Sequence, residues 1–555
     1  MAVRPLFFLA AIFSVGLTLS ACAPQRPQRA ACPAHERCLE YGNGADPVSL
    51  NPQIATAVNE AAILRELFEG MYADGPDGAP VPGVLLGEPQ VSPDGLTWTF
   101  HMRPEKWSDG VPLTANDFVF AYRHMLDPKT GSSYAYLLYV LKNGQPLNAG
   151  KAAPETLGVR ALDDETLQLT LEHPASFLPQ LLKHQAFYPI PEHVVQRLGE
   201  AWSKPGNMVG NGAYVLTAWK LGDYVRIDRN PLYHDAAKVC FDRVNYYPIG
   251  DPISAERRTL RDELDVSNTI QSNRVARLRA DKQWAPYVHA HPYLSLTYMI
   301  FNRRDVKPLQ DVRVRQAISM AVDRSFITDK LLRAGQVPTT SFVPAGIAGY
   351  LPASAPHPKP YWGNWPLEQR QAEAHRLLAA AGFGPDHPLS LELKTFNSPI
   401  SLLVMESVQS DLKTVGVSVH MRQEEGIVAL QSFEIRDFQL GDVGWIADYN
   451  DPMTYLTLMK SDTGAQNYGD YKNAAYDALL DKADNEPNAA TRTQYLARAE
   501  QMVLDDADVI PLLVGDNLNL VNPHITGWVD NDSDIHPIRY LCRNDAPAGA
   551  SNRAP

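Results

Sequence analysis

The stretch Gly444-Trp445-Ile446-Ala447-Asp448-Tyr449-Asn450-Asp451-Pro452 has the pattern of a strand end followed by a turn. It follows Asp437-Phe438-Gln439-Leu440-Gly441-Asp442-Val443, where apolar and polar residues alternate as in a half-buried strand. The closing Asn, Asp and Pro favour a turn. Such a strand end would present Trp445 and the Asp448 carboxylate as a binding site. A core tryptophan beside an ordinary Asx-turn is the alternative, and these residues alone favour neither.

Length and composition indicate a large buried core divided over two or three lobes. The chain has 555 residues, of which 45% are hydrophobic and 20% charged, too many for a single compact domain. Its net charge is -13 and its pI about 5.6. This acidic balance argues against a nucleic-acid surface, so no nucleic-acid partner is expected.

The N-terminus resembles a bacterial export signal. Arg4 precedes an apolar run over residues 6–19, which is too short to span a bilayer comfortably. The run ends in Leu19-Ser20-Ala21-Cys22, which resembles a lipobox. We therefore expect a signal peptide over 1–21, acylation of Cys22 and a tether over 22–38, with ordinary signal cleavage as the alternative. An exported, membrane-anchored lipoprotein of the cell envelope or periplasm follows.

Four cysteines remain once Cys22 is assigned to a lipid. An even number in an oxidising compartment predicts two disulfides, for which three pairings are possible. We prefer Cys32–Cys38 together with Cys240–Cys542. None of the spacings matches a CxxC metal or redox motif.

Periodicity along the chain predicts mixed helices and strands. Residues 207–234 contain two alternating runs punctuated by glycines and predict a hairpin. After about residue 293, strands alternate with helices, as in an α/β lobe. The expected helices are 60–71, 254–264, 311–324, 367–381, 400–415, 474–484 and 489–505.

Six short motifs occur in one order over about residues 45–540, and together they resemble the solute-binding components of bacterial ABC peptide importers. The oligopeptide-binding branch is the most similar. The motifs are Leu67-Phe68-Glu69-Gly70, Trp107-Ser108-Asp109-Gly110, Asn211-Gly212-Ala213-Tyr214, Arg229-Asn230-Pro231-Leu232-Tyr233, Asp311-Val312-Arg313-Val314-Arg315-Gln316-Ala317 and the stretch Gly444–Pro452.

The resemblance implies an α/β, two-lobed periplasmic-binding-protein-like fold of the class II type, with an additional small domain. Its two lobes close over a peptide by a hinge motion and hold the ligand mainly through backbone hydrogen bonds. The implied divisions are lobe I over 39–80, 191–293 and 513–543, the small domain over 81–190, lobe III over 294–512 and a disordered tail over 544–555.

The resemblance also implies a ligand site. Asp448 falls on the family aspartate that meets the peptide α-ammonium, and the backbone of Gly444 and Ala447 would run beside the ligand. For the aromatic positions, ordinary core packing is the alternative. The remaining implied site residues are Trp445, Tyr293, Tyr298, Asn397, Asn268 and Glu60.

Asp442 departs from the family pattern. Well-known oligopeptide members have an arginine at this position, one of several cations that meet peptide C-termini. The other aligned cation positions are Leu332, Phe433 and Leu402, although Arg436 could substitute. We therefore expect a ligand whose far end is cationic or amidated, or lacks a carboxylate at that depth.

Enzymatic and metal-dependent functions lack sequence support. The chain has no G-x-S-x-G, H-E-x-x-H or Walker motif, so no catalytic residues are expected. His289 and His291 share a strand face, but two histidines without a third ligand do not define a metal site. No cofactor or metal is expected, and metal-chelate binding ranks below the peptide functions.

The predicted function is extracytoplasmic capture of peptides and their delivery to an ABC permease and its ATPase by a monomeric protein. Two alternatives retain the same fold without a dedicated import role. One is a receptor for signalling peptides, and the other binds murein peptides or other modified peptides.

Overall fold

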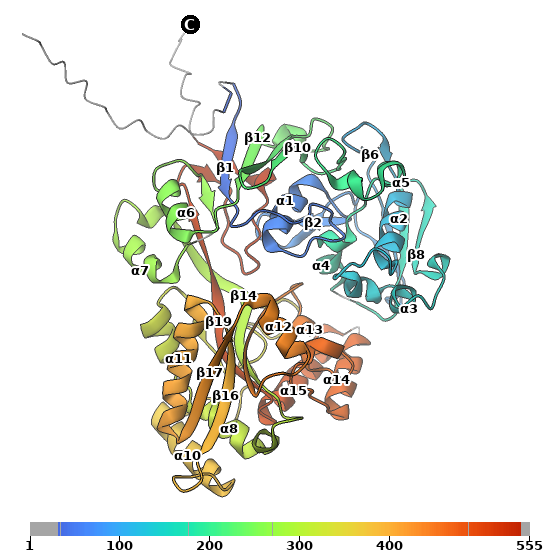
Figure 1. Ribbon diagram of the computed structural model, residues 1–555. Helices are drawn as coiled ribbons and strands as arrows, with labels where there is room; N and C mark the ends of the chain where they lie inside the picture. Colours follow the sequence, from blue (N-terminus) through green and yellow to red (C-terminus); the bar gives the residue numbers. More distant parts are fainter. Residues whose placement is uncertain (1–31, 34, 176, 269, 487, 545–555) are drawn as a thin grey trace, which may run out of the picture.

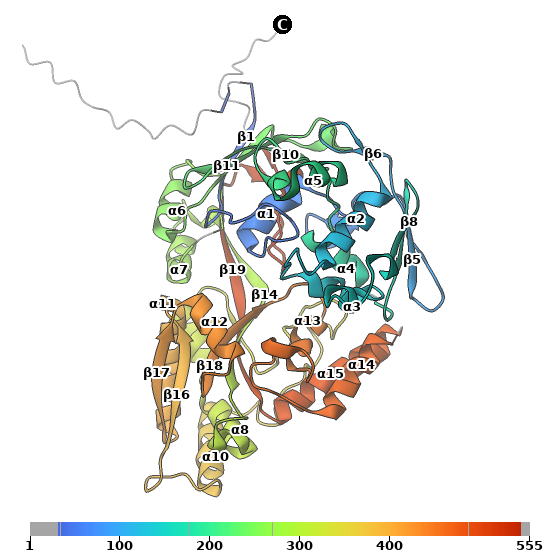
Figure 2. The same ribbon diagram turned by 45° about the vertical axis from the view of Figure 1, so that its right-hand side comes forward.

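The computed structural model describes residues 32–33, 35–175, 177–268, 270–486 and 488–544. The predicted signal peptide, Cys22 and all but the first residue of the predicted tail lie outside these ranges. Two bodies are joined by long strands (Figures 1 and 2). None of the helices in the described ranges is both long enough and apolar enough to cross a membrane.

One sheet of eleven strands in the described ranges runs through both bodies in the order β10-β11-β12-β1-β13-β19-β14-β18-β16-β17, with β15 paired to β19. The β1 strand is parallel to β12 and β13, and β16 is parallel to β17 and β18. The bounds are β1 Cys38–Gly42, β10 Tyr214–Lys220, β11 Tyr224–Arg229, β12 Arg243–Tyr247, β13 Val266–Ser267, β14 Val288–Phe301, β15 Val337–Pro338, β16 Leu389–Phe396, β17 Val417–Glu424, β18 Leu440–Ile446 and β19 Val509–Val521.

Strands β14 and β19 connect the two bodies, and both figures show them passing from one to the other. They pair in antiparallel fashion, from Val288 opposite Leu520 to Ile300 opposite Val509. The register is irregular between Pro292 and Leu296. The predicted boundaries 293/294 and 512/513 both fall inside these strands, so the division between lobes I and III passes through continuous β-structure.

A separate four-stranded sheet, β4-β5-β9-β8, lies entirely within the range predicted for the small domain. Helix α2 packs beside it, with Thr114 and Asp117 forming a capping box at its start. The predicted boundary at residue 81 falls within β3 (Pro80–Pro82), which pairs with β2 (Tyr72–Asp74). The bounds are β4 Gln90–Val91, β5 Thr97–His101, β8 Val159–Asp163, β9 Thr166–Thr170 and α2 Ala115–Leu126.

Lobe III has two hydrophobic cores. One core includes apolar residues of α8, α10 and α11, and the other includes residues of α14 and α15. Each core also includes apolar residues of β14, β18 and β19, with adjacent residues of β14 belonging to different cores, so the sheet lies between two helical layers. The helices agree closely with the predicted ranges: α8 Val312–Ala321, α10 Leu367–Ala380, α11 Pro399–Thr414, α14 Ala474–Asp484 and α15 Ala489–Asp505.

The lobe I helices begin two residues earlier than predicted. They are α1 (Val58–Leu67) and α6 (Pro252–Thr259), and α7 (Ser272–Ala280) follows β13. Other short elements are β6 Glu105–Lys106, β7 Pro112–Leu113, α3 Gly144–Asn148, α4 Leu178–Leu182, α5 Glu192–Leu198, α9 Arg324–Phe326, α12 Gly426–Glu434, α13 Met453–Leu456, β20 Ile525–Thr526 and β21 Cys542–Arg543.

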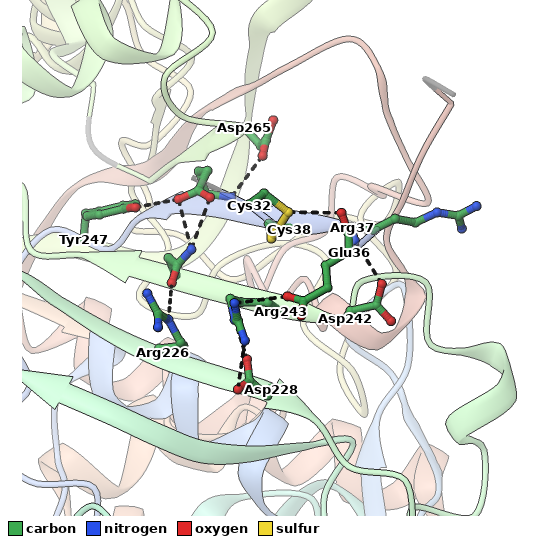
Figure 3. The surroundings of a disulfide bond; sticks show 12 residues. Cys32, Glu36, Arg37, Cys38, Arg226, Asp228, Asp242, Arg243, Tyr247 and Asp265 are labelled. Atoms are coloured by element: carbon green, nitrogen blue, oxygen red, sulfur yellow. Dashed lines mark hydrogen bonds and ion pairs between the residues drawn. A yellow bond between two sulfur atoms is a disulfide. The ribbon is translucent and has the colours of Figure 1, made fainter. Parts of the chain in front are cut away.

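Both preferred disulfides are present, Cys32–Cys38 and Cys240–Cys542. The first closes a short loop directly before β1, where Glu36 also pairs with Arg243 at 3.1 Å (Figure 3). The predicted tether is therefore wrong at its C-terminal end. Cys38 is buried and already belongs to β1, because the disulfide and the strand pairing hold this segment against lobe I.

Candidate functional site

The β18 strand carries an open edge at the junction of the lobes. Along one side it pairs with β14 from Leu440 to Ile446. Along the other side, β16 pairs only with Leu440 and Gly441. Among the described residues no strand pairs with this side beyond Gly441. Gly444 is exposed and Ile446 is 48% exposed, so this edge can accept an added strand.

Asp448 lies just beyond this open edge. The preceding residue, Ala447, extends the pairing because its N–H donates to Leu294 O at 2.9 Å. The Asp448 N–H donates to Thr454 Oγ1 at 3.2 Å, and its Oδ2 accepts the Tyr136 hydroxyl at 2.6 Å. Burial raises the pKa of the Asp448 carboxyl, and the Tyr136 hydrogen bond partly offsets that rise.

A pocket of about 90 Å³ surrounds this carboxylate, and its walls come from lobe I, the small domain and lobe III. Tyr293 and Ala447, both implied by the resemblance, line it. The pocket lies where lobe I, the small domain and lobe III meet, and this location suits a ligand that contacts all three. The full lining is Ala61, Arg65, Asp74, Gln180, Lys183, His184, Gln185, Tyr188, Tyr293, Leu294, Ile446, Ala447, Asp448, Tyr449, Asn450, Ser533 and Ile535.

The two cations that line this pocket, Lys183 and Arg65, pair with Asp74 and not with Asp448. Lys183 Nζ lies 2.8 Å from Asp74 Oδ1, and Arg65 Nε lies 3.5 Å from Asp74 Oδ2. Although burial would raise it, the pKa of Asp74 is held below its ordinary range by these two cations. Within the described residues no cation contributes to the pKa of Asp448. The pocket therefore contains one carboxylate that is already neutralised and one that is not.

Asp442 and Asn268 line a second cavity, of about 370 Å³, between lobes I and III. Asp442 is 3% exposed, and its Oδ2 accepts the Thr395 hydroxyl at 2.8 Å. Burial raises the pKa of Asp442 to about 6, although its hydrogen bonds with Thr395 and Ser401 lower that pKa. Asp516 lines the same cavity, and burial raises its pKa to about 6 as well.

Asp442, Gly444 and Ile446 lie on one face of β18, because successive strand side chains alternate. Asp442 and Ile446 are thus separated by roughly 13 Å along the strand. The open edge of β18 therefore runs from the Asp442 cavity toward the Asp448 pocket.

Three residues implied by the resemblance have structural roles in this conformation. Tyr298 is 3% exposed and packs edge-on against Phe342 in the lobe III core, so its assignment to the ligand site is corrected. Glu60 is also corrected. Its two carboxylate oxygens accept four backbone N–H groups, two from residues 48 and 49 of the preceding loop and two from residues 56 and 57 just before α1. Asn397 is exposed, and its Nδ2 donates to Glu425 Oε1 at 3.0 Å, outside both cavities.

Trp445 is half-buried rather than free in the cleft. It packs against the lobe III core, and its Nε1 donates to Thr454 Oγ1 at 3.2 Å. The same hydroxyl accepts the Asp448 N–H. Trp445 therefore helps to fix the backbone that carries the carboxylate.

Sequence reasoning missed Tyr136. It belongs to the short 3₁₀ helix Ala135–Val140 of the small domain, 312 residues before Asp448. The segment Ser133-Tyr134-Ala135-Tyr136 is rich in tyrosine, but nothing in its local pattern indicates a contact with lobe III.

Most of the motifs that carry the resemblance build the scaffold. Asn211 Nδ2 donates to Glu69 O at 2.8 Å, and Asn211 Oδ1 accepts the Glu69 N–H at 3.0 Å. Tyr233 donates its hydroxyl to Glu69 Oε2 at 2.6 Å. Asp451, which belongs to the last motif, accepts two hydrogen bonds from Arg492, of 2.7 and 2.9 Å. Only Gly444–Asn450 contributes directly to the pocket and its open edge.

Comparisons with known proteins agree with this architecture. Residues 79–467 match the family described as "Bacterial extracellular solute-binding proteins, family 5 Middle". The periplasmic oligopeptide-binding protein OppA of Salmonella typhimurium is 35% identical over 504 residues, covering 90% of this chain and 91% of that protein.

Two solved structures are also similar. The Escherichia coli murein tripeptide-binding protein MppA has a TM-score of 0.80 at 33% identity, covering 92% of this chain and 99% of that one. Haemophilus influenzae OppA in complex with RPPGFSPFR has a TM-score of 0.78 at 29% identity, with coverage of 92% and 99%. The chain belongs to the bacterial extracellular solute-binding proteins of family 5, and its fold is that of the two-lobed peptide-binding members.

Proposed function

We propose that this protein captures peptides outside the cytoplasmic membrane and delivers them to an ABC permease and its ATPase. Relatives named as oligopeptide-binding and murein-peptide-binding proteins support this class of ligand. In this proposal the chain performs no chemistry on the peptide. It binds as a monomer, and a lipid on Cys22 anchors it to the membrane.

One observation carries the peptide proposal: a buried carboxylate follows directly after an open strand edge. A peptide in extended form adds to such an edge through main-chain hydrogen bonds, which are independent of its sequence. The backbone of Gly444 and Ala447 supplies this edge and its continuation. The α-ammonium of the peptide then reaches Asp448, whose carboxylate has no cationic partner among the described residues.

The energetics favour capture of a cation at this position. Burial already disfavours the ionised form of Asp448, so an arriving ammonium relieves a desolvation cost that the empty protein bears. A hydrogen bond to a charged group contributes about 1.5–3 kcal/mol. Ammonium binding therefore stabilises a conformation in which the lobes and the small domain remain together around the pocket.

Asp442 defines the chemistry at the other end of the edge. An acidic side chain in the 370 Å³ cavity repels a peptide carboxylate at this depth. Asp516 in the same cavity adds a second acidic group. We infer that the preferred peptides carry a basic or amidated group at this position. Murein peptides and other modified peptides stay within the ligand class.

Asp448→Asn tests the anchor. By calorimetry, we expect the variant to lose about 10- to 150-fold in affinity for peptides with a free amine, which corresponds to 1.5–3 kcal/mol. An N-acetylated peptide should bind wild type as weakly as the free peptide binds the variant. Asp386→Asn, which changes an exposed carboxylate of lobe III, serves as the control. Equal affinity of wild type and Asp448→Asn for the free peptide would disprove the assignment.

A further inference from the structure

Three potential metal ligands meet beside the interlobe strands, outside the peptide edge. His291 lies on β14 opposite Asn517 of β19. Asp534 and His536 lie in the segment between β20 and the 3₁₀ helix Ile538–Tyr540 of lobe I. One nitrogen or oxygen atom from each of the three falls within 4.8 Å of the others. Sequence reasoning noticed His291 but could not supply the two distant ligands.

The three ligand atoms lie close enough to hold a single ion once His536 and Asp534, which are hydrogen-bonded at 2.9 Å, move slightly apart. His536 Nε2 lies 2.9 Å, and His291 Nε2 lies 3.4 Å, from the same atom, Asp534 Oδ1. Zinc binds nitrogen and oxygen ligands at about 2.0–2.2 Å, so adjacent ligands of a tetrahedral ion are separated by roughly 3.3–3.5 Å. Two imidazoles and one carboxylate are also a ligand set that divalent transition ions prefer over magnesium or calcium.

The hydrogen bonding of His291 presents a lone pair to this position. Its Nδ1 lies 3.1 Å from Pro292 O, which can only accept, so the proton is on Nδ1. In the neutral ring, Nε2 therefore carries a lone pair that faces Asp534, and this buried atom has no hydrogen-bond partner. A cation between the ring and the carboxylate would give His291 Nε2 a partner. Donation of the other ring N–H to a backbone carbonyl is a common feature of metal-bound histidines.

Neighbouring side chains hold the other two ligands in place. Asn519 Nδ2 donates to Asp534 Oδ1 at 2.7 Å. The Trp528 ring stacks on the His536 ring, with centroids 3.7 Å apart and planes at 17°. Such supporting contacts orient ligands before an ion binds. His291 and His536 are 9% and 8% exposed, so the cluster is largely shielded from solvent.

We propose that His291, Asp534 and His536 bind one divalent transition ion, for which Zn²⁺ is the best match, with a fourth position left for water. Ser533 and Ile535, which alternate with the ligands along the chain, line the Asp448 pocket. The ion would tie β14, which passes between the lobes, to the lobe I segment that forms this pocket wall. Its role would be to fix the wall against which the peptide closes, and the peptide itself is not a ligand of the ion.

The test uses the mature protein without a histidine tag, treated with a chelator and titrated with Zn²⁺ alone in a calorimeter at neutral pH. We expect one ion per chain. His291→Gln and His536→Gln should each weaken binding at least about tenfold, since even outer-shell partners change metal affinity 10- to 100-fold. His289→Gln is the matched control, because His289 lies on the same strand but pairs with Asp530 at 2.9 Å instead.

A second readout is the thermal and spectroscopic response of the protein to Zn²⁺. Zn²⁺ should raise the melting temperature of wild type and of His289→Gln, as any ligand specific to the folded state does. Trp528 fluorescence should change with the same one-to-one saturation, since its ring stacks on His536. Absence of stoichiometric binding by wild type, or binding that both glutamine variants retain at wild-type affinity, would overturn the proposal. In that case a protonated His291 paired with Asp534 accounts for the cluster.

Discussion

The Tyr136 hydroxyl donates to Asp448 Oδ2 across 2.6 Å and so joins the small domain to lobe III. This hydrogen bond stabilises the ionised carboxylate and opposes the rise in pKa that burial causes. Tyr136 thus favours the ionised form of Asp448, and its hydrogen bond ties the small domain to lobe III.

Tyr136→Phe removes this donor without changing the ring. The pKa of Asp448 should then rise further, and peptide affinity should be lost at a higher pH than in wild type. A charged hydrogen bond of about 1.5–3 kcal/mol corresponds to roughly one to two pH units. Calorimetry with one free-amine peptide between pH 5 and pH 8 measures the displacement. Superimposable pH profiles for the two proteins would show that Tyr136 does not act through Asp448.

Asp442→Asn should stabilise the folded protein in a pH-dependent way. The folded-state pKa, about 6, lies above the ordinary 3.8. The carboxyl therefore favours folding fully only below about pH 4, and this contribution disappears as the pH rises through 6. An amide resembles the protonated group, so the variant should exceed wild type by up to about 3 kcal/mol at pH 8 and match it at pH 4.

Urea unfolding of both proteins at pH 4 and pH 8 checks this expectation. Buried acids such as Glu500 and Asp516, whose pKa values burial raises to about 7 and about 6, are common to both proteins and cancel in the difference. If the free energy of unfolding of Asp442→Asn minus that of wild type were smaller at pH 8 than at pH 4, the prediction would be contradicted.

Asp442 should also select ligands. Peptides with lysine at the residue that reaches the second cavity should bind about tenfold or more tightly than matched glutamate peptides, because a charged hydrogen bond exceeds 1.4 kcal/mol. Competition binding at pH 7.5 measures the ratio. The preference should shrink in Asp442→Asn and, in wild type, below about pH 6, where the carboxyl is protonated. A flat or reversed preference would remove Asp442 as the determinant.

Local sequence patterns predicted much of the fold. The helix ranges in lobe III agree because their apolar periodicity is local and because Gly382 and Gly416 end two of them with φ values of 91° and 83°. Tyr298 could also have been assigned correctly. Leu296, Tyr298 and Ile300 alternate on one face of β14, and all three belong to the lobe III core.

The site required information that sequence periodicity does not contain. Asp448 was singled out because the stretch around it matches a family motif, and the structure places it in the wall of a pocket. Tyr136 was missed because Asp448 is 312 residues away. His536 was missed because His291, the third member of its cluster, lies on a distant strand and meets it only when separate segments assemble. Glu60 shows the opposite error, since its carboxylate is occupied by backbone N–H groups of the preceding loop and of the residues just before its own helix.

The two disulfides should differ in their contribution to stability. Cys32 and Cys38 are 6 residues apart, whereas Cys240 and Cys542 are 302 apart and join lobe I to the C-terminal segment. In the chain-entropy account, the longer loop restricts the unfolded chain more, by about 3 kcal/mol at these lengths. Cys240→Ser/Cys542→Ser should therefore unfold at a clearly lower urea concentration than Cys32→Ser/Cys38→Ser. The reverse order would mean that the short loop acts through the folded state, by holding residues 32–38 and β1 in place beside Arg243.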